Sequence, residues 1–134
     1  MGGWVLLSAG EASGDLLGAE LAAELQRRAP DLELAGMGGD RMGAAGVALA
    51  VHARDVAVVG LTEAVGRLPR LWRAYRLLTG MLRDPRPDLL VCIDFPEFNL
   101  LLARAAARVR VPVCYYVSPQ VWAWRRGRIR TLRR

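Results

Sequence analysis

The sequence contains no lysine, a single histidine and only two cysteines, and these shortages exclude several kinds of chemistry. All 19 basic residues are arginines, against 13 acidic residues, for a net charge of +6. With His52 alone, neither a Ser-His-Asp triad nor a multi-histidine metal site is supported. Cys92 and Cys114 form no C-x-x-C pattern, so we expect two reduced thiols in the core of a cytoplasmic protein. We therefore expect no metal and no cofactor.

Long apolar runs are also missing. The uncharged stretches MGAAGVALAVHA and VPVCYYVSPQVWAW are shorter than the roughly 20 residues that span a bilayer. The early segment WVLLSAG lacks the basic leader of a secretory signal. A hydrophobic content of 53% over 134 residues is typical of one folded domain. We expect a soluble or surface-bound protein whose positive charge favours anionic partners.

Strand-like apolar runs alternate with helical segments along the chain. Strands are expected near residues 4–8, 32–36, 47–51, 56–60, 88–93 and 111–117. Helices are expected near 16–28, 41–45, 62–83, 97–108 and from about 124, with the regular part of the third helix beginning at Pro69. This alternation predicts an α/β domain: a Rossmann-like parallel sheet with helices on both faces.

Three polar segments each follow a predicted strand, namely SAGEASGD, DFPEFN and SPQVWAW. In sheets of this kind ligands bind beyond the carboxyl ends of the strands. We therefore expect the three segments to converge at one edge of the sheet and to form a binding site.

Asp94 follows a buried strand directly, where a carboxylate is costly unless it has a partner or a task. One interpretation makes it a helix cap, with Pro96 beginning the next helix and Glu97 and Asn99 in its first turn. The other makes it a general base at the mouth of a cleft. The residues leave both interpretations open.

The segment SAGEASGD also has two interpretations. Gly10 and Gly14 permit close backbone approach, Ser13 can cap the following helix, and Asp15 favours its N-terminus. Glu11 would repel a phosphate and suits a sugar hydroxyl better. Capping and ligand contact remain equally open here, as do a flexible loop and a tight turn for GMGGDRM.

The segment YYVSPQVWAWRR gathers polar and aromatic residues around one proline turn, which favours ligand binding over a purely structural corner. Its tryptophans can pack over sugar rings, and Arg125 or Arg126 can hold a phosphate.

Residues 65–83 have helical amphipathicity, with apolar side chains within an arc of roughly 140° and arginines opposite and beside them. Either this helix packs on the sheet with a solvated arginine face, or it contacts anionic lipid with Trp72 and Tyr75 at the interface.

Five segments together resemble the lipid-A-disaccharide synthase family in order and spacing: SAGEASGDLLGAEL, GMGGDRMGAAG, VVGLTEAVGRL, PDLLVCIDFPEFNLLLA and YYVSPQVWAWRRGR. The resemblance implies the N-terminal half of a two-domain GT-B glycosyltransferase that inverts the sugar it transfers. Such enzymes join UDP-2,3-diacylglucosamine to 2,3-diacylglucosamine 1-phosphate in lipid A biosynthesis, at the cytoplasmic face of the inner membrane. The partners implied are these two acylated sugars and the anionic membrane surface, without nucleic acid.

The resemblance also assigns roles to residues. It implies that Asp94 is the catalytic base, acting on the 6-hydroxyl of the acceptor. The implied acceptor-binding residues are Gly10, Glu11, Ser13, Gly14, Asp15, Glu97, Asn99, Ser118, Gln120, Trp122 and Arg125. The implied membrane-contact residues are Leu68, Arg70, Leu71, Trp72, Arg73, Tyr75 and Arg76.

Members of that family are much longer than this chain. We therefore expect residues 1–134 to be one acceptor-side domain without the UDP-sugar-binding domain, inactive alone and prone to self-association through an exposed sheet edge. Two other interpretations remain: a non-catalytic basic membrane-binding module, and a nucleotide-sugar epimerase-like domain.

Overall fold

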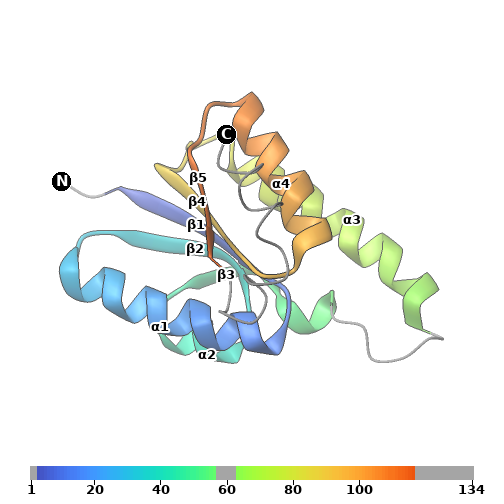
Figure 1. The fold of residues 1–134 in the computed structure, drawn as a ribbon, viewed down its shortest axis with the longest axis horizontal. Helices are drawn as coiled ribbons and strands as arrows, with labels where there is room; N and C mark the ends of the chain where they lie inside the picture. The colour runs from blue at the N-terminus through green and yellow to red at the C-terminus, as the bar shows by residue number, and fades with distance from the viewer. Residues whose placement is uncertain (1–2, 57–62, 117–134) are drawn as a thin grey trace.

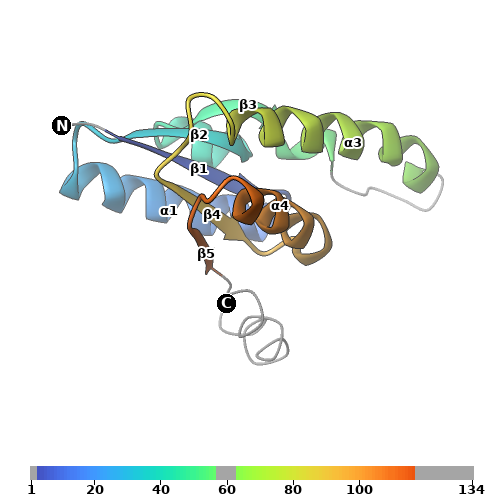
Figure 2. The same ribbon diagram turned by 90° about the horizontal axis from the view of Figure 1, so that it is seen from above.

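The fold is a five-stranded parallel sheet covered by helices on both faces (Figures 1 and 2). The structure is a computed structural model that describes residues 3–56 and 63–116, with side chains in the second range from residue 69 onward. The strands are β1 (Trp4–Ala9), β2 (Glu33–Gly38), β3 (Ala48–His52), β4 (Leu89–Ile93) and β5 (Val113–Tyr116), in the order β3-β2-β1-β4-β5. The helices are α1 (Ala12–Arg28), α2 (Asp40–Ala44), the 3-10 helix η1 (Ala53–Asp55), α3 (Glu63–Met81) and α4 (Pro96–Arg108). The predicted Rossmann-like α/β class is confirmed.

The sheet separates two apolar cores. Figure 1 shows α1 and α2 below the sheet and α3 and α4 above it. Along β1, Leu6 packs in the core under α3 and α4, whereas Val5 and Leu7 pack in the core of α1. Successive strand residues point to opposite faces, so both sets are buried and the strand is apolar throughout.

Several predicted boundaries differ from the structure. Helix α1 begins at Ala12 rather than Leu16, so Ser13 and Asp15 lie within its first turn. Helix α3 extends N-terminal of Pro69, which the prediction placed at the start of the regular part. An interior proline costs about 3 kcal/mol, and the burial of Ala74 and Leu78 in later turns of the helix offsets that cost.

Two further predictions concern the ends of the described ranges. Of the strand expected at 56–60, Val56 lies in a turn after η1 and the rest lies outside the described residues, as does the helix expected from 124.

Both cysteines are free, and Cys92 is buried as predicted. The prediction for Cys114 is wrong: it is exposed, because β5 is the outer strand of the described sheet and only its alternate residues Val113 and Tyr115 are partly buried against the core.

The C-terminus of α4 is closed by a Schellman motif. The N–H of Val111 donates to the carbonyl of Ala106 at 2.9 Å, and the N–H of Arg110 donates to that of Ala107 at 3.1 Å. Arg110 has a φ of 62°, at the position where glycine is usual. A side chain in this left-handed conformation costs about 1 kcal/mol.

No helix within the two described ranges combines the length and apolar character needed to cross a membrane.

Candidate active site at the carboxyl end of the sheet

The chain changes direction across the sheet between β1 and β4. From β1 the order runs through β2 to β3 on one side, and through β4 to β5 on the other. Such a switch point opens a crevice beyond the carboxyl ends of the two strands, where ligands bind. Ala9 pairs with Ile93 at these ends, so the segments beginning with Gly10 and Asp94 leave the sheet side by side. Two of the three predicted segments therefore converge, and the third lies outside the described residues.

Asp94 and Phe95 both have left-handed backbone, with φ of 48° and 49°. This conformation is rare for residues other than glycine and costs roughly 1–3 kcal/mol at each position. The Asp94 carbonyl accepts hydrogen bonds from the Asn99 Nδ2 at 2.7 Å and the Tyr115 hydroxyl at 3.2 Å, and the Asp94 N–H donates to the Tyr116 carbonyl at 3.2 Å. Strain of this kind gathers at functional sites, where surrounding bonds hold it in place.

Asn99 holds the backbone of this site in place through its side-chain amide. Its side chain is fully buried, and its Nδ2 also donates to the Ser8 carbonyl at 3.1 Å while the Ser8 hydroxyl donates to its Oδ1 at 2.6 Å. Both ends of the amide are therefore used inside the protein. Asn99 thus joins the ends of β1 and β4 and positions the Asp94 backbone, while its contact with an acceptor stays a prediction.

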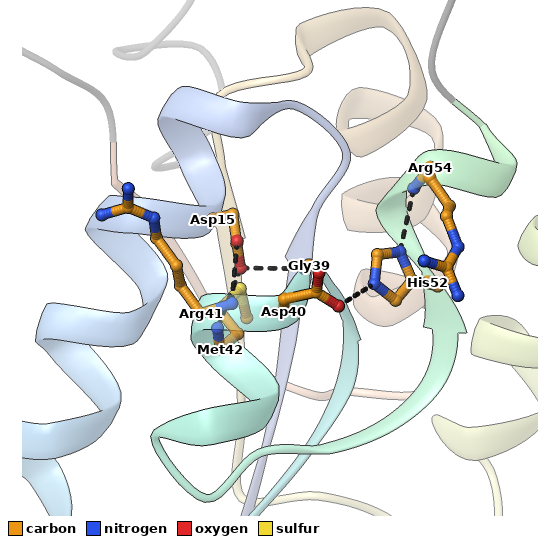
Figure 3. Close-up of polar contacts among 7 residues, drawn as sticks. All are labelled: Asp15, Gly39, Asp40, Arg41, Met42, His52 and Arg54. Atoms are coloured by element: carbon orange, nitrogen blue, oxygen red, sulfur yellow. Dashed lines mark hydrogen bonds and ion pairs between the residues drawn. The ribbon is translucent and has the colours of Figure 1, made fainter.

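Asp15 has a similar structural role, shown in Figure 3. Its Oδ1 accepts from the N–H groups of Gly39 at 2.8 Å and Met42 at 2.9 Å, and its Oδ2 accepts from the N–H of Arg41 at 3.1 Å. It is 8% exposed and caps α2, rather than favouring the start of its own helix. Three backbone donors therefore account for the Asp15 carboxylate, and its contact with an acceptor stays a prediction.

The two glycines of the first segment allow close packing. A Cβ on Gly10 would lie 2.3 Å from the Phe95 ring, and one on Gly14 would lie 3.2 Å from the Ala9 Cβ. Gly10 therefore leaves room for Phe95, and Gly14 brings α1 close to the sheet. Packing within the protein therefore accounts for glycine at both positions.

The remaining predicted acceptor residues divide into two groups. Glu11, Ser13 and Glu97 are exposed at the edge beside Asp94. Ser118, Gln120, Trp122 and Arg125 lie outside the described residues.

An apolar hollow of about 540 Å³ adjoins Asp94 through Phe95. Helix α3 contributes Leu71, Trp72 and Tyr75 to its lining, and Phe98 and Leu101 of α4 lie opposite. Its aromatic rings are in contact: Phe95 stacks on Phe98 at 5.3 Å, and Tyr75 meets Phe98 edge-on at 6.2 Å between centroids. Trp72 remains 61% exposed. The hollow could not be predicted from the α3 pattern alone, because its other wall comes from α4.

The predicted membrane-contact set is only partly gathered here. Leu71, Trp72 and Tyr75 line the apolar hollow, whereas Arg70 and Arg73 line a separate hollow with Asp55. Arg76 is exposed, and the side chain of Leu68 is outside the described part. The α3 helix therefore packs on the sheet and also presents an aromatic face.

His52 pairs with Asp40 near the ends of β2 and β3 (Figure 3). The Arg54 N–H donates to His52 Nδ1 at 3.1 Å, so the proton of a neutral ring lies on Nε2, which is 2.8 Å from Asp40 Oδ1. The hydrogen bond from His52 holds the pKa of Asp40 below its ordinary value. We did not predict this pair from the sequence, because Asp40 and His52 come together only through the neighbouring ends of β2 and β3.

The chain matches the sequence model of the family described as lipid-A-disaccharide synthetase over residues 5–134. The chain belongs to this family. It is 49% identical over 130 residues to the lipid-A-disaccharide synthase of Myxococcus xanthus, covering 97% of this chain and 34% of that protein. It is 52% identical over 129 residues to that of Syntrophotalea carbinolica, covering 96% of this chain and 33% of the relative. The chain thus spans about a third of the length of these relatives.

Proposed function

We propose that this chain is the acceptor-side part of a lipid-A-disaccharide synthase. Asp94 takes the proton from the 6-hydroxyl of 2,3-diacylglucosamine 1-phosphate, and that oxygen attacks the anomeric carbon of UDP-2,3-diacylglucosamine. The carbon–oxygen bond to UDP breaks with inversion, releasing UDP and the disaccharide phosphate. The observation that carries the proposal is the strained Asp94–Phe95 backbone, at the switch point of the sheet, in a member of this family.

The surroundings of Asp94 suit a positioned base. Its backbone is held by Asn99, Tyr115 and Tyr116, which fixes the position of the residue at the end of β4. One base is sufficient for an inverting transfer when other groups stabilise the leaving diphosphate. We assign the acceptor sugar to the edge formed by Glu11, Ser13 and Glu97, with Ser118, Gln120, Trp122 and Arg125 completing the site.

The apolar hollow supplies a place for an acyl chain of the acceptor. It is continuous with Phe95, the residue after the proposed base, and aromatic and leucine side chains line it. A diacylated sugar must place its chains out of water while its hydroxyl reaches Asp94, and this arrangement meets both needs.

Binding of the UDP-sugar is assigned to the part of the longer relatives that this chain does not span. The exposed Trp72, with Arg70, Arg73 and Arg76, is assigned to peripheral contact with the anionic inner face of the inner membrane.

The test is Asp94→Asn in a full-length protein that carries this segment. Asparagine keeps the shape of the side chain but cannot accept the proton, so we expect kcat to fall at least about 100-fold with the acceptor KM little changed. Asp31→Asn, in an exposed loop at the other end of the sheet, is the matched control. A rate for Asp94→Asn close to that of the control would show that Asp94 is not the base.

The same assay separates this proposal from a non-catalytic membrane module, which the exposed Trp72 also favours. Release of UDP by the unmodified protein, dependent on both acylated sugars, excludes a module that only binds membrane.

A further inference from the structure

Four arginines surround one hollow at the end of the molecule opposite Asp94. Arg83 and Arg86 lie in the loop from α3 to β4, and Arg108 and Arg110 lie at the turn from α4 to β5. Together with Val109 they line a hollow of about 350 Å³. Both loops precede their strands, so the hollow lies at the amino ends of β4 and β5, about 16 Å along the sheet from Asp94.

The four positive charges are not balanced locally. Among the described residues, none of the four arginines forms an ion pair, although Asp84 follows Arg83 directly. The C-termini of α3 and α4 point to this end, and each carries about half a negative charge. The two helix ends and the Asp84 carboxylate therefore offset about two of the four charges and leave a cationic hollow.

The backbone at this hollow is arranged at a cost to the fold. Arg110 occupies the left-handed position of the Schellman motif, where glycine would relieve strain. Arg86 is anchored by its Nη1, which donates to the Val109 carbonyl at 3.1 Å. A strained arginine and a tethered arginine, facing the same hollow, favour a role for the side chains beyond capping the helix.

We propose that this hollow binds a phosphate group. Guanidinium groups present paired N–H donors that match phosphate oxygens, and several of them around one site suit a dianion. The phosphate is carried either by a small soluble molecule or by a lipid headgroup. The second source is favoured by a smaller hollow of about 120 Å³, which shares Arg83 and Arg108 with the arginine hollow and Tyr75 with the apolar hollow between α3 and α4.

The test measures binding to this chain by calorimetry with inorganic phosphate, at constant ionic strength set with chloride. We expect saturable binding that Arg83→Gln/Arg108→Gln weakens at least about tenfold, since two charge-assisted contacts are lost. The matched control is Arg27→Gln/Arg28→Gln, which removes the same charge from the end of α1, where both side chains pair with Glu24. It should change affinity by less than about twofold, as expected for a distant screened charge.

Arg110→Gly separates binding from folding. Glycine relieves the left-handed backbone, so we expect a melting temperature equal to or above that of the unmodified chain, with phosphate affinity reduced about threefold or more. A lower melting temperature together with unchanged affinity would show that Arg110 serves only the turn, and would count against the site.

A parallel arm uses phosphatidylcholine vesicles with and without phosphatidic acid. Loss of phosphatidic-acid-dependent binding in Arg83→Gln/Arg108→Gln, but not in the α1 control, assigns the phosphate to a lipid. Calorimetric binding with vesicle binding unaffected by these variants assigns it to a soluble molecule. If neither ligand depends on these arginines more than on Arg27 and Arg28, the proposal is wrong.

Discussion

At the scale of single residues, the polar side chains of this site are mostly supports. Asn99 and Ser8 are joined although 91 positions separate them in the chain, and Asp15 caps a helix that begins 25 positions later. Asn99 and Asp15 were assigned to the acceptor site by the family resemblance, whereas the residues alone placed them at the starts of helices. Their partners are set by the packing of distant strands, so no local pattern contained them.

Replacing Asn99 by alanine should destabilise the fold by about 2–4 kcal/mol, because the Ser8 hydroxyl and the Asp94 carbonyl lose buried partners. Urea unfolding of this chain measures the change. Ser13→Ala, at an exposed position of α1, serves as the control and should stay within about 0.5 kcal/mol. Equal midpoints for the two variants would mean that the Asn99 network contributes nothing to stability.

The two cysteines should differ sharply in reactivity. Burial raises the pKa of the Cys92 thiol, so it stays protonated at neutral pH, whereas Cys114 is exposed on β5. We expect iodoacetamide to label one thiol in the native chain and both in urea, as counted by mass spectrometry. Cys114→Ser should abolish native labelling, and rapid labelling of that variant would contradict the burial of Cys92.

At the scale of elements, α3 and α4 form the part of the structure that links the fold to the proposed function. The helical pattern of residues 65–83 predicted an apolar face on α3, and that face divides between the core and the hollow. Ala74, Leu78 and Leu82 are buried, whereas Trp72 lies on an adjacent side of the helix and stays exposed. The division depends on where α4 lies against α3, which periodicity along a single helix does not specify.

Trp72→Ala should therefore affect ligand handling more than stability. Most of the ring is already in water, so we expect the free energy of unfolding to change by less than about 1 kcal/mol. We expect binding to anionic vesicles to weaken severalfold. In a full-length protein carrying this segment, the acceptor KM should rise severalfold. Leu77→Ala, 48% exposed on α3 and outside the apolar hollow, is the control. Equal effects of the two variants would argue against a specific role for the hollow.

At the scale of the whole molecule, the alternation of strands and helices was enough to predict the fold class and to place the candidate site at the carboxyl edge of the sheet. The strand order β3-β2-β1-β4-β5 was not predicted, because parallel pairing is decided by contacts between distant segments. The order explains the site, since it places the ends of β1 and β4 together. Composition adds a second property of the whole chain, a positive charge carried entirely by arginine.

Acid should destabilise this chain, and salt should reduce the effect. Hydrogen bonds from Arg27 and Arg28 hold the pKa of Glu24 below 4.5, and that from His52 holds the pKa of Asp40 below 3.8. Because the folded pKa values lie below the unfolded ones, both groups add stability above pH 4.5, and that stability is lost as pH falls through the folded values. Protonation of the other carboxylates also leaves the arginines unbalanced.

Thermal unfolding followed by circular dichroism at pH 7, 4 and 3 tests this prediction. The melting temperature should fall toward pH 3, and added salt should recover part of the loss by screening repulsion between arginines. Glu24→Gln should lower the melting temperature slightly at pH 7 and by less as the pH falls, because protonation of Glu24 removes the exposed pair. A melting temperature that rises on acidification would contradict the argument.

The bonds among Ser8, Asn99 and Asp94 have a mechanical consequence. They join the ends of β1 and β4 to the start of α4, so this edge of the sheet moves as one rigid unit. A substrate cannot draw Asp94 closer by bending β4 away from β1. Under the proposed function, any closure around the acceptor must then come from the part of the protein that faces this edge, with Asp94 as the fixed point.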